Sequence, residues 1–446
     1  MNDNAWMSED KVSSVVKKMA IPSVISSLVT VVYNMADTFF VGQTGDPLQV
    51  AAVSLTNPIF ILFMAIANML GMGGSAIASI ALGKKDQEKV KNVSSFVTYF
   101  SVAVGVIFCL ILLVFQNGLL TLFGANSETL DLAKGYTLYI AIGAPFIIFS
   151  AAASFIVRAS GDSKQAMIGN MIGTMLNIVL DPIFVSVFNK GAAGAAIATT
   201  ISNIIASIYY IYYFEKKSKS MSIRFKYFTF KVCKDICVSG LPMALFSSLM
   251  SISTIITNLI LASYGNSAIA AAGIVFKANM FVSFLQMGIA NGVQPILGYC
   301  YGSNNQERFK EVEAYTKKCC LICGVILSCL YIVFRSQIIS IFINDSQTIE
   351  YGIPLLVGYT LSGPFIGLLF MNMNVLQTLN HPLAATVLSL CRQGLLFIPL
   401  LFILNMLFGF NGVTVAQSLT DIITIVLSIV LRKQVINSLE LSFERS

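Results

Sequence analysis

Two aspartates stand inside long hydrophobic stretches, where an acidic side chain is rare. Asp37 lies in VVYNMADTFF and Asp181 lies in NIVLDPIF. Asn177 is one helical turn before Asp181 and shares its helix face, and Thr199 follows in GAAGAAIATT. Carboxylate, amide and hydroxyl oxygens are the ligands that hard cations such as Na⁺ favour, and two carboxylates in one dry site can instead share a proton. These residues therefore predict a site for Na⁺ or H⁺.

The same residues also have a purely structural interpretation. Asp181 can cap the chain near Pro182, and Asp37 can bond a neighbouring hydroxyl. We favour the functional interpretation, because acids within membrane helices are costly and usually functional. Pro22 removes a backbone hydrogen bond from the first stretch and predicts a kink there, either a fixed one or one that changes with the charge on Asp37.

Three further charged residues fall in the second half of the chain. Lys277 and Asp421 are expected at similar depth, which predicts a structural ion pair. Arg392 is expected to extend toward the membrane surface or to bond loop carbonyls. The nine cysteines lie mostly in apolar runs and His381 is the only histidine, so no catalytic residue is assigned, and no metal site is expected beyond Na⁺ at the four oxygen-bearing residues.

The elements that must position these residues are membrane-spanning helices. Of the 446 residues, 56% are hydrophobic and 11% are charged, with a mean hydropathy of +0.79, which excludes a water-soluble fold. A spanning helix needs about 20 apolar residues. Twelve runs meet this need, at 18–42, 51–82, 93–116, 136–158, 165–188, 191–214, 237–262, 269–299, 318–343, 352–379, 383–407 and 411–431. Asp37, Asp181 and Thr199 then lie roughly 8 to 12 Å from the outer face, in one layer.

The charges sort by side of the membrane. Segments on one side hold 23 of the 28 Lys and Arg residues, so the positive-inside rule predicts that both termini are cytoplasmic in a cell-membrane protein. The net charge of +7 is thus explained without nucleic acid. The polar first 20 residues run directly into the first span, so no cleavable signal peptide is expected.

The chain also repeats itself. Pro22 and Pro242 begin similar stretches, and Gly83 with Gly302 and Gly194 with Gly412 keep a similar offset. We therefore predict an N-lobe of helices 1–6 at residues 1–214, a cytoplasmic linker at 215–236, and a C-lobe of helices 7–12 at 237–446. Six spans per repeat give both lobes the same topology, a geometry suited to alternating access.

Six motifs resemble the multidrug and toxic compound extrusion (MATE) family, and the likeness covers almost the whole chain. The motifs are AIPSVISSLVTVVYNMADTFFVG, RASGDSKQAM, NIVLDPIF, GAAGAAIAT, GVQPILGYCYG and CRQGLLFIP. The resemblance implies an all-α integral membrane protein with two six-helix lobes in a V shape. It also implies export of organic cations and drugs in exchange for Na⁺ or H⁺.

Carried over residue by residue, the family's first-lobe cation site falls on Asp37, Asn177, Asp181 and Thr199. Tyr136 is a further candidate, although Tyr139 could serve instead. The second lobe departs from one branch of the family, because spans 7 and 10 lack its acidic residues. The chain thus resembles the bacterial branch whose acids lie only in the first lobe.

Three functions remain to be compared. The first is a secondary-active multidrug antiporter for small, cationic, aromatic substrates, with a coupling ion, no cofactor and a monomeric state. The second is a lipid-linked oligosaccharide flippase, which would need basic residues in its cavity to meet a diphosphate. The third is an intramembrane enzyme, but no nucleophile with its base, HExxH motif or GxGD aspartate pair is present. We therefore predict a transporter and not an enzyme.

Overall fold

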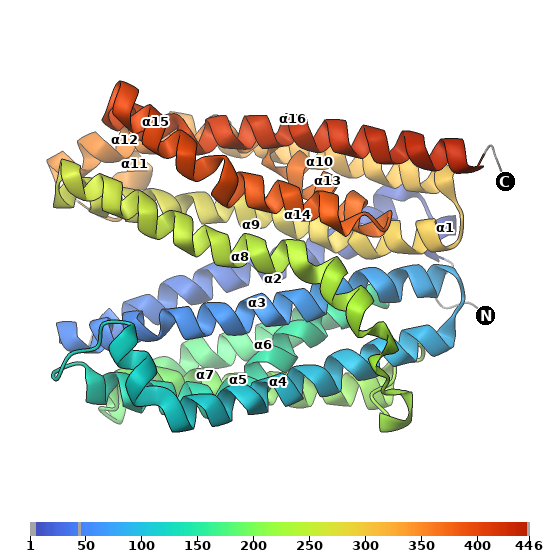
Figure 1. Cartoon of the computed structure of the whole chain (residues 1–446), viewed down its shortest axis with the longest axis horizontal. Helices are drawn as coiled ribbons and strands as arrows, with labels where there is room; N and C mark the ends of the chain where they lie inside the picture. The colour runs from blue at the N-terminus through green and yellow to red at the C-terminus, as the bar shows by residue number, and fades with distance from the viewer. Residues whose placement is uncertain (1–5, 43–45, 344, 444–446) are drawn as a thin grey trace. The chain divides into compact units, whose positions relative to one another are not determined.

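A computed structural model describes residues 6–42, 46–343 and 345–443, except for the side chains at 34, 37–39, 41, 42, 47 and 439–443. Every regular element within this part of the chain is helical (Figure 1). Twelve of its helical segments are long and apolar enough to cross a membrane. The twelve-helix, all-α prediction is therefore confirmed for the described residues.

The chain divides into two compact units, one of residues 25–240 and one of residues 1–24 with 241–446. The boundary at residue 24 falls inside the first spanning helix, shortly after Pro22. The predicted lobes at 1–214 and 237–446, with the linker at 215–236, stay a prediction.

The unit of residues 25–240 is built around one central helix. That helix, α5, packs against α3, α4, α6 and α7 (Figure 1). Apolar side chains such as Phe63, Ile140 and Ile147 fill the core between them. The elements that begin in this unit or cross its boundaries are α2 (Val12–Gly42), α3 (Pro47–Gly83), α4 (Gln87–Leu122), α5 (Leu130–Ala159), α6 (Ser163–Pro182), η1 (Ile183–Val187), α7 (Gly191–Tyr212), η2 (Tyr213–Lys217), η3 (Phe225–Tyr227), η4 (Phe230–Val232) and α8 (Cys233–Leu261).

The other unit has a core formed by α9 with α10, α12 and α13, against which α16 packs through α12 and α13. The N-terminal helix α1 is held to it by Arg308, whose Nε donates to the carbonyl of Met7 at 3.3 Å. Its elements, apart from the end of α8, are α1 (Trp6–Glu9), η5 (Ala262–Tyr264), α9 (Asn266–Gly302), α10 (Gln306–Val333), α11 (Arg335–Ser340), α12 (Ser346–Thr360), η6 (Gly363–Phe365), α13 (Ile366–Thr378), α14 (Pro382–Leu390), η7 (Cys391–Leu395), α15 (Phe397–Phe408) and α16 (Phe410–Phe443).

The turns between helices repeat along the chain. Lys85 after α3 and Asn304 after α9 both have positive φ, 60° and 58°. The next residue in each turn caps the following helix: Asp86 accepts from the backbone N–H of residue 89, and Asn305 accepts from that of residue 308. Left-handed turn residues and side-chain caps are local choices, so their recurrence is independent support for the internal repeat.

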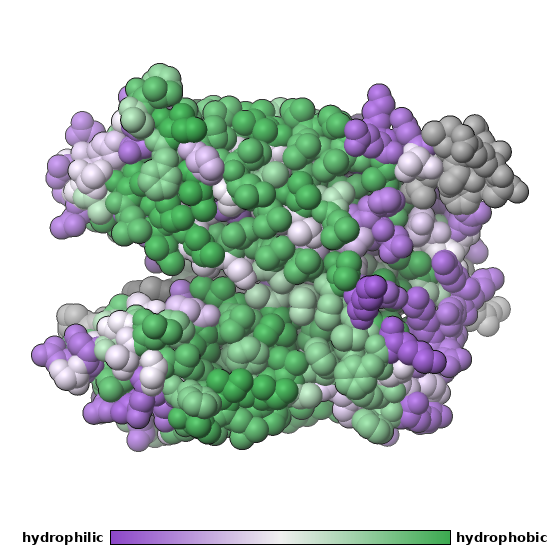
Figure 2. Space-filling model, in the orientation of Figure 1, coloured by the Kyte–Doolittle hydropathy of each residue, from purple (hydrophilic) through white to green (hydrophobic). Residues whose placement is uncertain are grey.

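In both units the hydropathy of the surface changes along the length of the helices. Hydrophobic side chains cover the middle of the helices, and hydrophilic side chains gather at their ends (Figure 2). Exposed residues in the middle of α4 include Leu110 and Phe115, which are 58% and 61% exposed. A broad apolar belt with polar ends is what lipid contact requires.

Candidate functional site

The first polar cluster lies between α6 and α7. Asn177 and Asp181 are one turn apart on α6, and their residues are 3% and 0% exposed. Thr199 faces them from α7 and is 4% exposed. The amide orientation of Asn177 that satisfies both its ends places its nitrogen 3.0 Å from Asp181 Oδ2 and its oxygen 3.3 Å from Thr199 Oγ1. The structure therefore brings three of the predicted cation-site residues together.

A tight hairpin positions these side chains. After Asp181 and Pro182 the chain forms the π-helical turn η1, then reverses through Asn189, whose φ is +52°. Gly194 at the start of α7 lies against this turn: a Cβ there would be 2.6 Å from the carbonyl carbon and oxygen of Phe184. Glycine is thus required for the close approach of the two helices that carry Asp181 and Thr199.

Helix α5 packs against both α6 and α7, the helices that carry this cluster. Tyr136 is buried on α5 in the same hydrophobic cluster as Val185 and Ala195, which flank the polar residues on η1 and α7. The hydroxyl of Thr200 donates to the carbonyl of Tyr139 at 2.8 Å, which ties α7 to α5. Tyr139 contributes its backbone to this tie, and the place of Tyr136 in the cation site stays a prediction.

One polar neighbour was absent from the sequence-based site. The Asn203 amide donates to the Thr199 carbonyl at 2.9 Å and accepts from Ser150 at 2.8 Å. Its four-residue spacing from Thr199 on one helix face is the signal that could have revealed it.

The two predicted site residues on α2, Asp37 and Pro22, are not tested by the structure. Asp37 lies within helical backbone of α2, but its side chain is outside the described part of the structure, so its place in the cation site stays a prediction. Pro22 lies inside α2, which continues as one helix through it. Its conformational role also stays a prediction.

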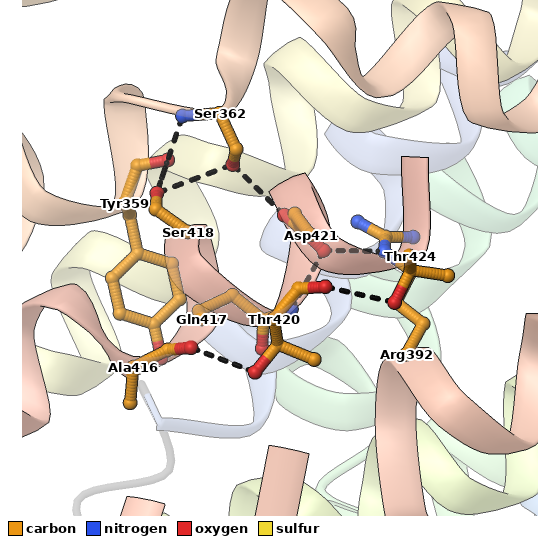
Figure 3. Close-up of polar contacts among 9 residues, drawn as sticks. All are labelled: Tyr359, Ser362, Arg392, Ala416, Gln417, Ser418, Thr420, Asp421 and Thr424. Atoms are coloured by element: carbon orange, nitrogen blue, oxygen red, sulfur yellow. Dashed lines mark hydrogen bonds and ion pairs between the residues drawn. The ribbon is translucent and has the colours of Figure 1, made fainter. Parts of the chain in front are cut away.

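The second polar cluster surrounds Asp421 on α16 (Figure 3). Arg392 Nε lies 2.8 Å from Asp421 Oδ1 in an ion pair whose side chains are 5% and 1% exposed. Gln417 donates to the same oxygen at 3.0 Å, and Ser362 donates to Oδ2 at 2.8 Å. The carboxylate is thus held by a cation and two neutral donors.

This arrangement corrects two predictions. The expected pair of Lys277 with Asp421 is wrong, because Arg392 occupies that carboxylate and Lys277 is exposed on α9. Arg392 also does not extend to the surface or to loop carbonyls. Its guanidinium lies over the rings of Phe246 and Phe370, 5.3 and 5.2 Å from their centroids. Position along a helix does not fix the direction and reach of a long side chain, which is why the sequence missed this pair.

A cavity of about 230 Å³ adjoins the second cluster. Its lining includes Arg392 and Gln417, together with aromatic and methionine side chains, among them Phe246, Met250, Phe284, Met287 and Phe370. Aromatic rings and flexible thioethers suit flat hydrophobic molecules of varied shape. Because Asp421 neutralises Arg392, the cavity does not present an isolated positive charge.

The two clusters offer different chemistry. A buried carboxylate with amide and hydroxyl groups can bind a small hard cation or a proton. A carboxylate already paired with guanidinium has its charge compensated, and removal of either partner would leave an uncompensated buried charge. Among the described residues, no three His, Cys, Asp or Glu side chains gather into a metal site.

A family profile matches this chain twice, once in each half of the internal repeat. The MatE family profile matches residues 22–183 and 242–403, so the two matches begin at Pro22 and Pro242. The chain is 35% identical over 408 residues to "Multidrug export protein MepA" of Staphylococcus saprophyticus, covering 90% of both chains. It is 34% identical over 422 residues to the protein of the same name from Staphylococcus aureus, covering 93% of this chain and 92% of that one.

A solved structure agrees in fold. It is described as "Outward-facing conformation of a multidrug resistance MATE family transporter of the MOP superfamily", and matches with a TM-score of 0.92 at 24% identity, over 98% of this chain and 99% of that one. The twelve apolar helices, the family profile and the curated relatives together define a multi-pass membrane protein of the transporter class. The chain belongs to the MATE family, whose members are transporters and not enzymes.

Proposed function

We propose that this chain exports drugs, chiefly flat organic cations, in exchange for Na⁺ or H⁺ by alternating access. The curated relatives are named as multidrug export proteins, which supports drug export here. In this proposal the protein works as a monomer in the cell membrane, with both termini in the cytoplasm. The excess of Lys and Arg on one side supports that orientation.

The observation that carries ion coupling is the buried cluster of Asp181, Asn177 and Thr199. A carboxylate within a membrane helix costs several kcal/mol unless it is used or compensated, and Asp181 is 0% exposed. Its partners here include an amide that can turn either its nitrogen or its oxygen toward the carboxylate. This set can therefore hold a protonated acid or a bound Na⁺, with Asp37 as the proposed second carboxylate.

Coupling follows from linkage. If Na⁺ or H⁺ binding lowers the affinity for drug, drug binding must lower the affinity for that ion by the same factor. One charge moving across 100 mV contributes about 2.3 kcal/mol. Exchange of one coupling ion for one monovalent drug moves no net charge, so it would depend on the ion gradient alone.

The apolar cavity beside Arg392 supports the proposal that the substrates are aromatic. Its rings and methionines provide contact area without fixed hydrogen-bond geometry, which allows several drugs to bind. The compensated charge of Arg392 leaves room for a cationic substrate.

The test is drug uptake into everted membrane vesicles with Na⁺ and pH gradients imposed separately. One gradient should drive uptake, and Asp37→Asn should abolish it while protein abundance is unchanged. Asp131→Asn is the matched control, because that carboxylate is 88% exposed in a surface pair with Lys134. Full uptake by the Asp37 variant, or no response to either gradient, would refute ion coupling.

A further inference from the structure

The segment between the two repeats is docked on α4. Ser94 and Ser95 donate to the carbonyl of Ser222 at 2.8 and 2.7 Å. Tyr99 donates to the carbonyl of Ile223 at 2.9 Å. These bonds cross more than 120 residues of sequence, so the segment is held in place against the helix.

Aromatic rings extend this contact. Phe228 stacks on Phe96 at 5.9 Å and on Phe225 at 5.6 Å. Phe225 also meets the Tyr99 ring edge-on at 5.3 Å, and Phe230 contacts Phe96 at 6.0 Å. Yet Phe225 and Phe230 remain 69% and 64% exposed. Two phenylalanines are thus fixed on one side by the protein and open on the other.

The depth of these rings matches a lipid interface. The apolar part of α4 begins at Val93, so Tyr99 lies roughly 9 Å further along the helix. Amphipathic segments at membrane surfaces bury their apolar face about 5 to 10 Å deep, at the boundary of headgroups and acyl chains. Rings that contact Phe96 and Tyr99 lie in this range.

The surrounding charge matches anionic headgroups. The stretches 84–91 and 215–235 together hold eleven Lys or Arg and four Asp or Glu. Arg224, Lys226 and Lys231 are exposed directly beside the two phenylalanines. Lys226 also lies 4.8 Å from the Tyr227 ring, which keeps its ammonium on this surface. The cytoplasmic side of a cell membrane is where negative lipid charge attracts such residues.

We propose that residues 218–232 form an interfacial anchor for anionic phospholipids of the inner leaflet. Phe225 and Phe230 insert at the acyl boundary, and Arg224, Lys226 and Lys231 bind the headgroup phosphates. The leaflet rests on the orientation proposed above. The anchor itself requires neither drug transport nor an ion gradient, so it can fail or hold independently of the exporter proposal.

A tryptophan probe tests the insertion. Trp6 is the only tryptophan, so Phe225→Trp is made in a Trp6→Phe background of the full chain and placed in phosphatidylcholine nanodiscs. We expect blue-shifted emission that lipids brominated on the acyl chain quench strongly. Gln306→Trp in the same background is the control, because it is exposed at the polar start of α10. Equal, weak quenching of both probes would overturn the proposal.

The headgroup claim has its own measurement. The affinity for phosphatidylglycerol, titrated into phosphatidylcholine nanodiscs, should fall roughly fivefold for each of Arg224→Gln, Lys226→Gln and Lys231→Gln. Lys277→Gln removes an exposed charge elsewhere and should leave this affinity unchanged. If inorganic phosphate at equal concentration competes the lipid away, or the three variants bind as the parent does, no anionic-lipid anchor exists.

Discussion

The two buried aspartates, Asp181 and Asp421, have similar burial and different surroundings. Asp421 receives a guanidinium, an amide and a hydroxyl from three different parts of its unit. Asp181 shares its space with the amide of Asn177 one turn away, and with Thr199 across the helix pair. A carboxylate matched by a fixed cation already has its charge compensated, while a carboxylate beside neutral amide and hydroxyl groups can bind and release an ion. The comparison teaches that buried carboxylates are told apart by their partners, which is the basis of the proposal that Asp181 binds the coupling ion.

The largest effect is expected when the negative charge of Asp181 is removed. Asp181→Asn should reduce gradient-driven uptake to background, because the amide cannot carry the negative charge that attracts Na⁺ or H⁺. The unfolding temperature should change little, since asparagine preserves shape and can still pair with Asn177. Uptake in everted vesicles and thermal unfolding in detergent measure the two effects. A large loss of stability with normal uptake would reverse the roles assigned to the two aspartates.

The second test removes the cation from the other pair. Arg392→Ala leaves Asp421 buried without its charge partner, which should lower the free energy of unfolding by about 3 to 5 kcal/mol. Thermal unfolding of the purified protein measures this loss. The double variant Arg392→Met with Asp421→Asn is the control and should recover most of it. If the single variant is as stable as the parent, the ion pair does not hold the helices.

A smaller effect distinguishes ligand from scaffold in the first cluster. In the proposed site the Asn177 amide oxygen is a ligand of the bound cation, so Asn177→Ala should weaken ion binding by about 1.5 to 3 kcal/mol, the size of a hydrogen bond to a charged group. The ion concentration for half-maximal uptake should therefore rise roughly 10- to 100-fold, with maximal uptake largely kept. Asn203→Ala removes the neighbouring hydrogen bond to the Thr199 carbonyl and should raise this half-maximal ion concentration less. Equal shifts would assign Asn177 a merely structural role.

The smallest effect is expected at Lys277. This residue is exposed and Asp421 is held by Arg392. Lys277→Gln should therefore change the free energy of unfolding by no more than about 0.5 kcal/mol and leave drug uptake unchanged. Both assays above measure it. A destabilisation comparable to that of Arg392→Ala would restore the ion pair first expected from sequence.

Most of the fold could be predicted from sequence, because apolar length and helical periodicity are local properties. The Asn177 and Asp181 pair was equally accessible, since four-residue spacing fixes a shared face. The partner of Asp421 was not, because Arg392 reaches it from the π-helical turn η7, at Cys391–Leu395, with a long side chain. The docking of residues 218–232 on α4 depends on hydroxyl-to-carbonyl bonds between distant segments, which leave no periodic signal.

The contact at Gly194 makes the first cluster sensitive to a change that carries no charge. A methyl group there would push directly on the Phe184 peptide and widen the α6–α7 hairpin. Ligand spacing is what distinguishes cations of different radius, so Gly194→Ala is expected to alter the ion selectivity of the proposed cation site without removing any of its oxygen-bearing side chains.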